Sequence, residues 1–126
     1  MAGYTKVNLQ DVDNSSQTEG NEARFSRKHL DSQELGVSLF RYKPSYRSPR
    51  SHKHRVQEEV YVVIKGSGQI LLDNKIEELK QWDTVRVAPE VVRSFAAGPE
   101  GLELLAIGGR KPAEGDGEPQ DAEWPS

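Results

Sequence analysis

Two histidines and two glutamates lie close together near the middle of the sequence, as His52-Lys53-His54 followed after a short gap by Glu58 and Glu59. On an extended segment residues i and i+2 project to the same face, so both imidazoles converge if this stretch is a strand. Two imidazoles and one carboxylate are a sound ligand set for Zn²⁺, Fe²⁺, Mn²⁺, Co²⁺ or Ni²⁺. Spacing alone favours a plainer interpretation, namely two partly exposed strand histidines in a basic loop.

Composition narrows the chemistry that this cluster could perform. The 126 residues include no cysteine, which excludes disulfides, thiolate nucleophiles and cysteine-based metal sites. Any metal must therefore be held by histidine, carboxylate, backbone or water. With 17 basic and 20 acidic residues the formal charge is −3, which argues against binding to nucleic acid. No apolar run approaches the ~20 residues of a membrane helix, so we expect no membrane association.

The segments around the cluster are short, rich in β-branched residues and closely punctuated by turn residues. Segment 59–65 is dense in β-branched and aromatic residues, and Gly66-Ser67-Gly68 after it is interpreted as a turn. The spacing predicts six or seven short strands, which favours an all-β sandwich or barrel. The expected strands are 36–42, 59–65, 69–73, 75–79, 84–87, 92–96 and 102–107. A short helix is compatible with 23–30.

The two ends of the chain are more polar than its centre. We interpret residues 1–22 as an N-terminal arm or loop, and residues 23–110 as the folded domain. Residues 111–126 contain three prolines and five carboxylates. They offer little apolar surface to offset the entropy of ordering, so we expect a mobile acidic tail.

The run HKHRVQEEVYVVIKGSG at 52–68 resembles the first signature of the cupin superfamily. That signature is His-x-His, three or four residues, Glu, six residues and Gly, and it is matched by His52, His54, Glu59 and Gly66. The resemblance implies a cupin-type double-stranded β-helix, which is a jelly-roll barrel. The flexible polar segments at both ends are expected from their composition alone. Strand parity then places Glu59 and Tyr61 inside the barrel.

The second cupin signature is degenerate in this chain. Trp82 stands at its first glycine, Ala88 at its proline and Arg93 at its histidine, which is the fourth metal ligand of the usual cupin site. A guanidinium stays protonated and donates no lone pair to a metal. Either Arg93 pairs with Glu59 and the site holds no metal, or the remaining three ligands hold a dication while Arg93 swings aside to bind an anionic substrate.

These features predict a small single-domain cupin that binds a small, anionic molecule in the barrel mouth beside a degenerate metal site. Arg93 and Tyr61 are the expected ligand-binding residues, and His52, His54 and Glu59 the expected metal ligands. We expect this site to bind one divalent transition metal (Zn, Mn, Fe or Ni), with a metal-free site as the open alternative. The alternative is a metal-dependent enzyme, either sugar-phosphate isomerase-like or a dioxygenase. A third hypothesis is an interaction module. No catalytic residue is identified.

The resemblance further implies a cytoplasmic bacterial protein that forms a homodimer. The two copies would meet on the outer side of the 59–65 strand, where Val60, Val62 and Ile64 project away from the barrel interior. Residues 41–55 form a basic stretch that contains six cations and no carboxylate. It is interpreted as a solvated loop and strand edge, with a positive rim that attracts an anionic small molecule as the sharper alternative.

Overall fold

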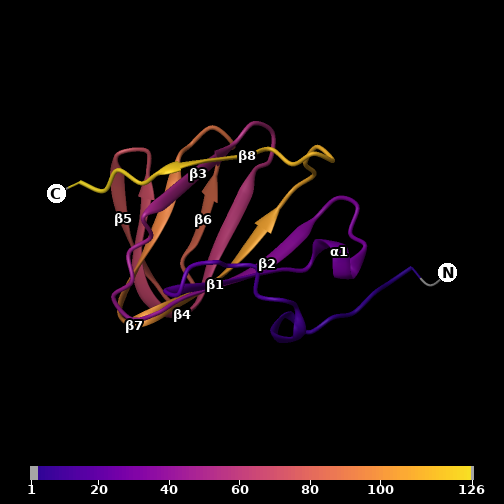
Figure 1. The fold of residues 1–126 in the computed structure, drawn as a ribbon, viewed down its shortest axis with the longest axis horizontal. Helices are drawn as coiled ribbons and strands as arrows, with labels where there is room; N and C mark the ends of the chain where they lie inside the picture. Colours follow the sequence, from indigo (N-terminus) through magenta and orange to yellow (C-terminus); the bar gives the residue numbers. More distant parts are fainter. Residues whose placement is uncertain (1–2, 126) are drawn as a thin grey trace.

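The computed structural model describes residues 3–125, and strands dominate it (Figure 1). The strands are β1 (Asn21–Phe25), β2 (Gly36–Tyr42), β3 (Arg50–His54), β4 (Glu59–Leu72), β5 (Lys75–Lys80), β6 (Thr84–Val87), β7 (Arg93–Gly108) and β8 (Gly117–Asp121). Two single turns of helix precede β2, namely η1 (Leu9–Asp11) and α1 (Arg27–Leu30). The strands form one curled sheet in the order β1-β2-β7-β3-β8, with β4 pairing to β5, β6 and β7. The all-β jelly-roll prediction is confirmed.

The long ribbon of β4 and β7 organises the barrel. These antiparallel strands pair from Glu59 opposite Gly108 to Leu72 opposite Arg93. The ribbon curls back on itself, so that its two ends meet. Glu59 and Arg93 stand at opposite ends of the ladder, yet Arg93 Nη1 lies 3.7 Å from Glu59 Oε1. Curling of this one ribbon therefore creates the place where the candidate site residues gather.

Glycine allows the curl. We predicted that Gly66-Ser67-Gly68 turns the chain between two strands, and this prediction is wrong, because β4 runs through it. The register with β7 shifts on both sides of Gly66, as at a β-bulge. Gly66 has φ of 80°, and a Cβ there would overlap the carbonyl oxygen of Gly101. A residue with a side chain fits neither that conformation nor that space. The expected strands 92–96 and 102–107 are likewise parts of the single strand β7.

The shorter strands agree more closely with the sequence. The expected strands 36–42 and 84–87 coincide with β2 and β6, and 75–79 with all but the last residue of β5. The compatible helix at 23–30 is reduced to α1, because the residues before it pair as β1 with β2. No helix within residues 3–125 is long and apolar enough to cross a membrane.

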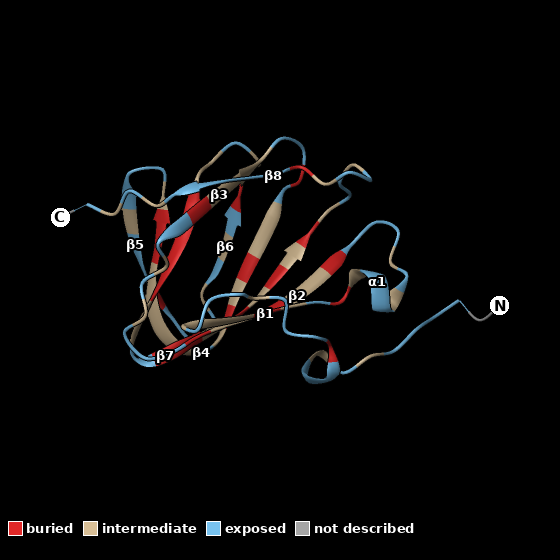
Figure 2. Cartoon of the chain, in the orientation of Figure 1, coloured by how far each residue is buried: buried red, intermediate tan, exposed pale blue. Residues whose placement is uncertain are grey.

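The interior of the barrel follows the predicted strand parity (Figure 2). Tyr61 and Val63 are buried with Phe95 and Leu104 in the main hydrophobic core. The side chains of Val60, Val62 and Ile64, which project outward from β4, are only half-buried, as is usual on the outer face of a sheet. The homodimer that we expected on this face stays a prediction, since the structure describes one copy of the chain.

The C-terminal segment differs from the tail that we expected at 111–126. Strand β8, yellow in Figure 1, pairs with β3 from Arg50 opposite Asp121 to His54 opposite Gly117. Farther on, Trp124 Nε1 donates a hydrogen bond of 2.9 Å to the carbonyl of Ser48. All five residues of β8 are exposed. Composition therefore gave no sign of it, because an edge strand is held by backbone hydrogen bonds that polar residues also make.

Candidate ligand and metal site

Strand β3 and the first residue of β4 bring together the three predicted metal ligands. His52 and His54 project from the same face of β3, and Glu59 begins β4 after a short loop. One ligand atom from each residue lies within 4.8 Å of the other two. The convergence that we predicted from the His-x-His spacing is therefore present, and the donors are the nitrogen and oxygen types that divalent transition metals accept.

Glu59 is the centre of this cluster. Its Oε1 accepts a hydrogen bond of 2.5 Å from the Tyr61 hydroxyl, and it lies 3.1 Å from His54 Nε2 and 3.6 Å from His52 Nε2. Burial works to raise the pKa of Glu59, but the contacts with both imidazoles and the tyrosine hydroxyl outweigh it and hold that pKa well below its usual range. Glu59 is therefore a carboxylate at neutral pH.

His54 stands between two carboxylates. Its Nε2 faces Glu59, and its Nδ1 lies 3.0 Å from Asp116 Oδ1. Burial works to lower the pKa of His54, but the hydrogen bonds to Glu59 and Asp116 outweigh it and raise the pKa. Both ring nitrogens donate at once only in the imidazolium form. In the absence of metal, the cluster therefore favours a protonated His54.

Asp116 is the site residue that the sequence analysis missed. It belongs to the loop before β8, and its side chain is fully buried. Oδ2 accepts backbone hydrogen bonds from Val56 at 2.7 Å and Gln57 at 2.8 Å. Burial works to raise the pKa of Asp116, but these bonds and the one from His54 lower it. No motif marks this residue among the acids of residues 111–126, because the pairing of β8 with β3 alone brings it to His54.

Arg93 lies at the position of the missing fourth ligand and is fully buried. Its Nη2 donates a 2.8 Å hydrogen bond to the carbonyl of Ala88, whereas Nε and Nη1 have no hydrogen-bond partner. Arg93 Nη1 forms an ion pair with Glu59 Oε1 at 3.7 Å, as we considered, but this exceeds hydrogen-bond distance, so the forked hydrogen-bonded geometry is not formed. Arg93 opposes His52 directly in the pairing of β7 with β3, so the backbone fixes it beside the predicted metal ligands.

No protein-family model matches the chain. An uncharacterized protein of Methanocaldococcus jannaschii is 41% identical over 39 residues, which are 31% of each protein. The chain thus matches less than a third of that relative's length.

Solved structures resemble the chain much more widely. A cupin protein of Bacteroides fragilis superposes on 90% of the chain and 89% of its own length, with a TM-score of 0.74 and 23% identity. Oxalate decarboxylase of Bacillus subtilis superposes on 90% of the chain and on 30% of its own length, with a TM-score of 0.75 and 20% identity. A cupin-superfamily sugar phosphate isomerase of Silicibacter pomeroyi covers 93% and 92%, with a TM-score of 0.72 and 16% identity.

The chain has the cupin fold. Within the cupin barrel, Tyr61 is buried with its ring edge against Phe95, at a centroid separation of 4.9 Å. Burial raises the pKa of Tyr61 well above its usual value, and the neighbouring Glu59 carboxylate adds to the rise. The hydroxyl therefore keeps its proton and donates a hydrogen bond to Glu59. A direct role for Tyr61 in ligand binding stays a prediction.

The cupin cavity has a volume of about 1010 Å³, within the range of small-molecule sites. Arg93 and the three predicted metal ligands line one part of it. The aromatic side chains of Phe25, Phe40, Tyr42 and Phe95 also line it. The cavity thus combines a charged region with an apolar one.

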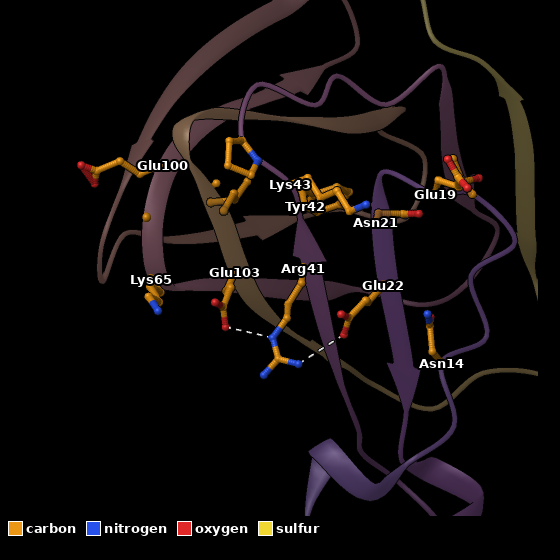
Figure 3. Close-up of a pocket in the computed structure, with 15 residues that line it drawn as sticks. Asn14, Glu19, Asn21, Glu22, Arg41, Tyr42, Lys43, Lys65, Glu100 and Glu103 are labelled. Carbon is orange, nitrogen blue, oxygen red and sulfur yellow. Dashed lines mark hydrogen bonds and ion pairs between the residues drawn. The ribbon is translucent and has the colours of Figure 1, made fainter.

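Two of the six cations in the basic stretch at 41–55, Arg41 and Arg50, form ion pairs. Arg41 contacts Glu103 at 3.1 Å and Glu22 at 3.2 Å, beside a second cavity of about 430 Å³ (Figure 3). Arg50 forms an ion pair with Asp121 of β8. These contacts favour the plainer of our two interpretations, in which the cations belong to a solvated strand edge.

Proposed function

We propose that this cupin binds a small organic anion in the barrel, with the Arg93 guanidinium as its counter-ion. The observation that supports the proposal is the fully buried Arg93 with two unpartnered nitrogen donors, Nε and Nη1. A buried donor left unpaired costs about 1–3 kcal/mol, and more when the group is charged. Carboxylate oxygens would accept from both donors, since guanidinium and carboxylate match in a two-point geometry.

The neighbouring charges permit an anion here. Glu59 and Asp116 contribute two negative charges to the cluster. Arg93 contributes one positive charge, and the raised pKa of His54 favours an imidazolium as the second. Because these cancel, an incoming anion meets a polar but electrically balanced site. His52, whose side chain is 38% exposed, offers a further ring nitrogen at the mouth.

Isothermal titration calorimetry tests the proposal, with acetate as the probe and metal removed by chelation. We expect the wild type to bind acetate and Arg93→Met to lose at least tenfold in affinity, because no other group supplies the two buried donors. Arg41→Gln is the matched control, since that arginine is already paired with two carboxylates. Its acetate affinity should equal that of the wild type.

A second measurement covers the case in which Arg93→Met fails to fold. In nitrogen-15 spectra of the wild type, the Arg93 Nε–H signal should shift on titration with acetate, since Nε gains its first acceptor. Unchanged acetate affinity in a folded Arg93→Met variant, or an Nε–H signal that does not move at saturating acetate, argues that the anion binds elsewhere or not at all.

A divalent metal held by His52, His54 and Glu59 is the second candidate function. The three donor atoms fit a metal in type and in spacing, and Asp116 bonded to His54 Nδ1 is the outer carboxylate that metal-bound histidines commonly have. A metal there would polarise a bound substrate oxygen. Arg93 beside Glu59 opposes the ion, because two positive charges at this range repel.

Melting temperatures with and without Zn²⁺, Mn²⁺, Fe²⁺ or Ni²⁺ test this candidate, together with elemental analysis. If the site binds metal, one of these ions should raise the melting temperature, and His54→Ala should abolish the rise. Arg93→His restores a fourth donor and removes the repelling charge, so its metal affinity should exceed that of the wild type. Absence of metal and of any thermal shift in both proteins removes the candidate.

A further inference from the structure

We infer that the anion is an amphipathic carboxylate whose body is aromatic or similarly flat and apolar, an inference that rests on the anion site proposed above. The same cavity that contains Arg93 has a second region of aromatic side chains, contributed by β1, β2 and β7. A ligand that fills both regions must be charged at one end and apolar at the other.

The aromatic region is an ordered surface. The rings of Phe25 and Phe40 meet edge to face, with centroids 5.6 Å apart and planes at 83°. The rings of Tyr42 and Phe95 stack at 5.9 Å and 29°. Tyr42 and Phe95 are buried in the core, so the edge-to-face pair of Phe25 and Phe40 offers the surface against which another flat ring would pack.

Phe25 is the aromatic residue of this region that is exposed to solvent. It lies at the end of β1 with 48% of its surface exposed, although it lines the cavity. Burying apolar area is favourable by about 25 cal/mol per Å². A ligand body seated against Phe25 would remove this surface from water, whereas a bare inorganic anion at Arg93 would leave it exposed.

The size of the cavity supports the same conclusion. A volume of about 1010 Å³ lies at the upper end of the range of small-molecule sites, far above what a carboxylate group alone occupies. Arg93 would fix one end of the ligand by charge, and the four aromatic rings line the cavity together with polar side chains. The geometry therefore points to a ring-bearing acid rather than to a small inorganic ion.

Calorimetry with a panel of probes tests the inference on the wild-type protein. The panel consists of acetate, benzoate, 3-phenylpropionate, uncharged benzamide and glucose 6-phosphate. We expect an aromatic acid to bind at least tenfold tighter than acetate, and benzamide to bind weakly because it lacks the charge that Arg93 recognises. Phe25→Ala should reduce the advantage of the aromatic acid at least threefold while it leaves acetate affinity unchanged. Trp82→Ala removes a 67% exposed aromatic outside the cavity lining and should change neither affinity.

The outcomes separate this inference from the proposed function. If acetate binds and neither aromatic acid binds more tightly, the inference fails while the anion site stands. If glucose 6-phosphate binds more tightly than both aromatic acids, the ligand class is wrong although the site again stands. If no anion binds, the anion site itself fails, and the inference with it. The wild-type panel decides between these results even if a variant does not fold.

Discussion

Arg93 and Arg41 lie on neighbouring strands, and each faces a glutamate, yet they differ in every property that matters for binding. Arg41 is a quarter exposed and lies within 3.2 Å of two carboxylates. Figure 3 marks both contacts with dashed lines. Arg93 is fully buried, donates one hydrogen bond to a carbonyl, and keeps two nitrogens without partners. The first cation is satisfied within the fold, whereas the second retains unused capacity to bind.

The contrast teaches where electrostatics serve stability and where they serve recognition. An exposed ion pair contributes about 0–1 kcal/mol, since water and salt screen it. A buried ion carries a desolvation penalty of several kcal/mol that only close counter-charges offset. At Arg93 the counter-charge is Glu59, whose Oε1 forms an ion pair with Nη1 at 3.7 Å without a hydrogen bond, so Nε and Nη1 keep unused donor capacity.

The largest expected effect comes from removing the counter-charge of Arg93. Glu59→Gln preserves the size of the side chain but leaves both Arg93 and a protonated His54 without that carboxylate. Because breaking a buried pair strands a charge, we expect the free energy of unfolding to fall by about 3–5 kcal/mol. Urea denaturation of the metal-free protein measures the loss.

Glu58→Gln is the matched control for this substitution. Glu58 precedes Glu59 directly, is exposed, and pairs with exposed Arg86 at 3.0 Å. Its replacement should change the free energy of unfolding by no more than about 1 kcal/mol. Equal losses in the two variants would contradict the distinction between a buried counter-charge and a surface pair.

A smaller effect is expected at Asp116. In Asp116→Asn, one acceptor oxygen becomes an NH₂ group that faces a backbone N–H or the His54 ring. Leaving a buried donor unpaired costs about 1–3 kcal/mol, and His54 also loses a negative neighbour. The variant should unfold at lower urea, and the pKa of His54, followed by NMR, should fall. Asp121→Asn alters an exposed acid of β8 and serves as the control, with no change expected in that pKa.

The pH dependence of stability follows from the same cluster, with a more modest change. The pKa of His54 is raised by folding, so its stabilising effect is complete below 6.5 and is lost as pH rises through the folded value. The pKa values of Glu59 and Asp116 are lowered from 4.5 and 3.8. The stabilising effect of these two carboxylates is present above pH 4.5 and 3.8, and it is lost as the pH falls through their lower pKa values in the folded state.

Metal-free protein should therefore be most stable between about pH 5 and 6.5, with a decline on the alkaline side due to His54. Melting temperatures from pH 4 to 9 in a chelating buffer show the profile. The variant His54→Gln should lack the alkaline decline. An identical decline in wild type and variant would assign it to another group.

The sequence predicted the general fold and the convergence of His52, His54 and Glu59, because both depend on short patterns. A spacing of two residues on a strand is enough to place His52 and His54 on one face, and parity places Glu59 and Tyr61 inside. The exact strands 36–42 and 84–87 are bounded by turn residues. Position 82 adds support for the degenerate signature, since Trp82 has a positive φ of 75° where the cupin pattern has glycine.

Features that depend on distant pairing escaped prediction. Gly66 resembles a turn residue in the sequence, but the opposing Gly101 makes it a bend within β4. Asp116 belongs to an acidic segment whose composition predicts a tail, and only its register beside β3 brings it to His54. Whether Arg93 bonds to Glu59 was equally beyond sequence reasoning, because it depends on how tightly the ribbon of β4 and β7 curls.

The smallest expected effect belongs to Arg41, the satisfied member of the comparison. Arg41→Gln removes two partly exposed ion pairs and should lower the free energy of unfolding by about 1 kcal/mol or less. Because those pairs are screened by salt, the difference from the wild type should shrink in 1 M NaCl, where the Debye length is about 3 Å.

The loss caused by Glu59→Gln should persist in the same salt, since Arg93 is shielded from solvent ions. Salt sensitivity of the two losses, measured by urea denaturation at low and high NaCl, therefore separates them independently of their size. If the Glu59→Gln loss vanished in salt as well, Arg93 would behave as a solvated cation, and its two free nitrogens would have water rather than a ligand as their partner.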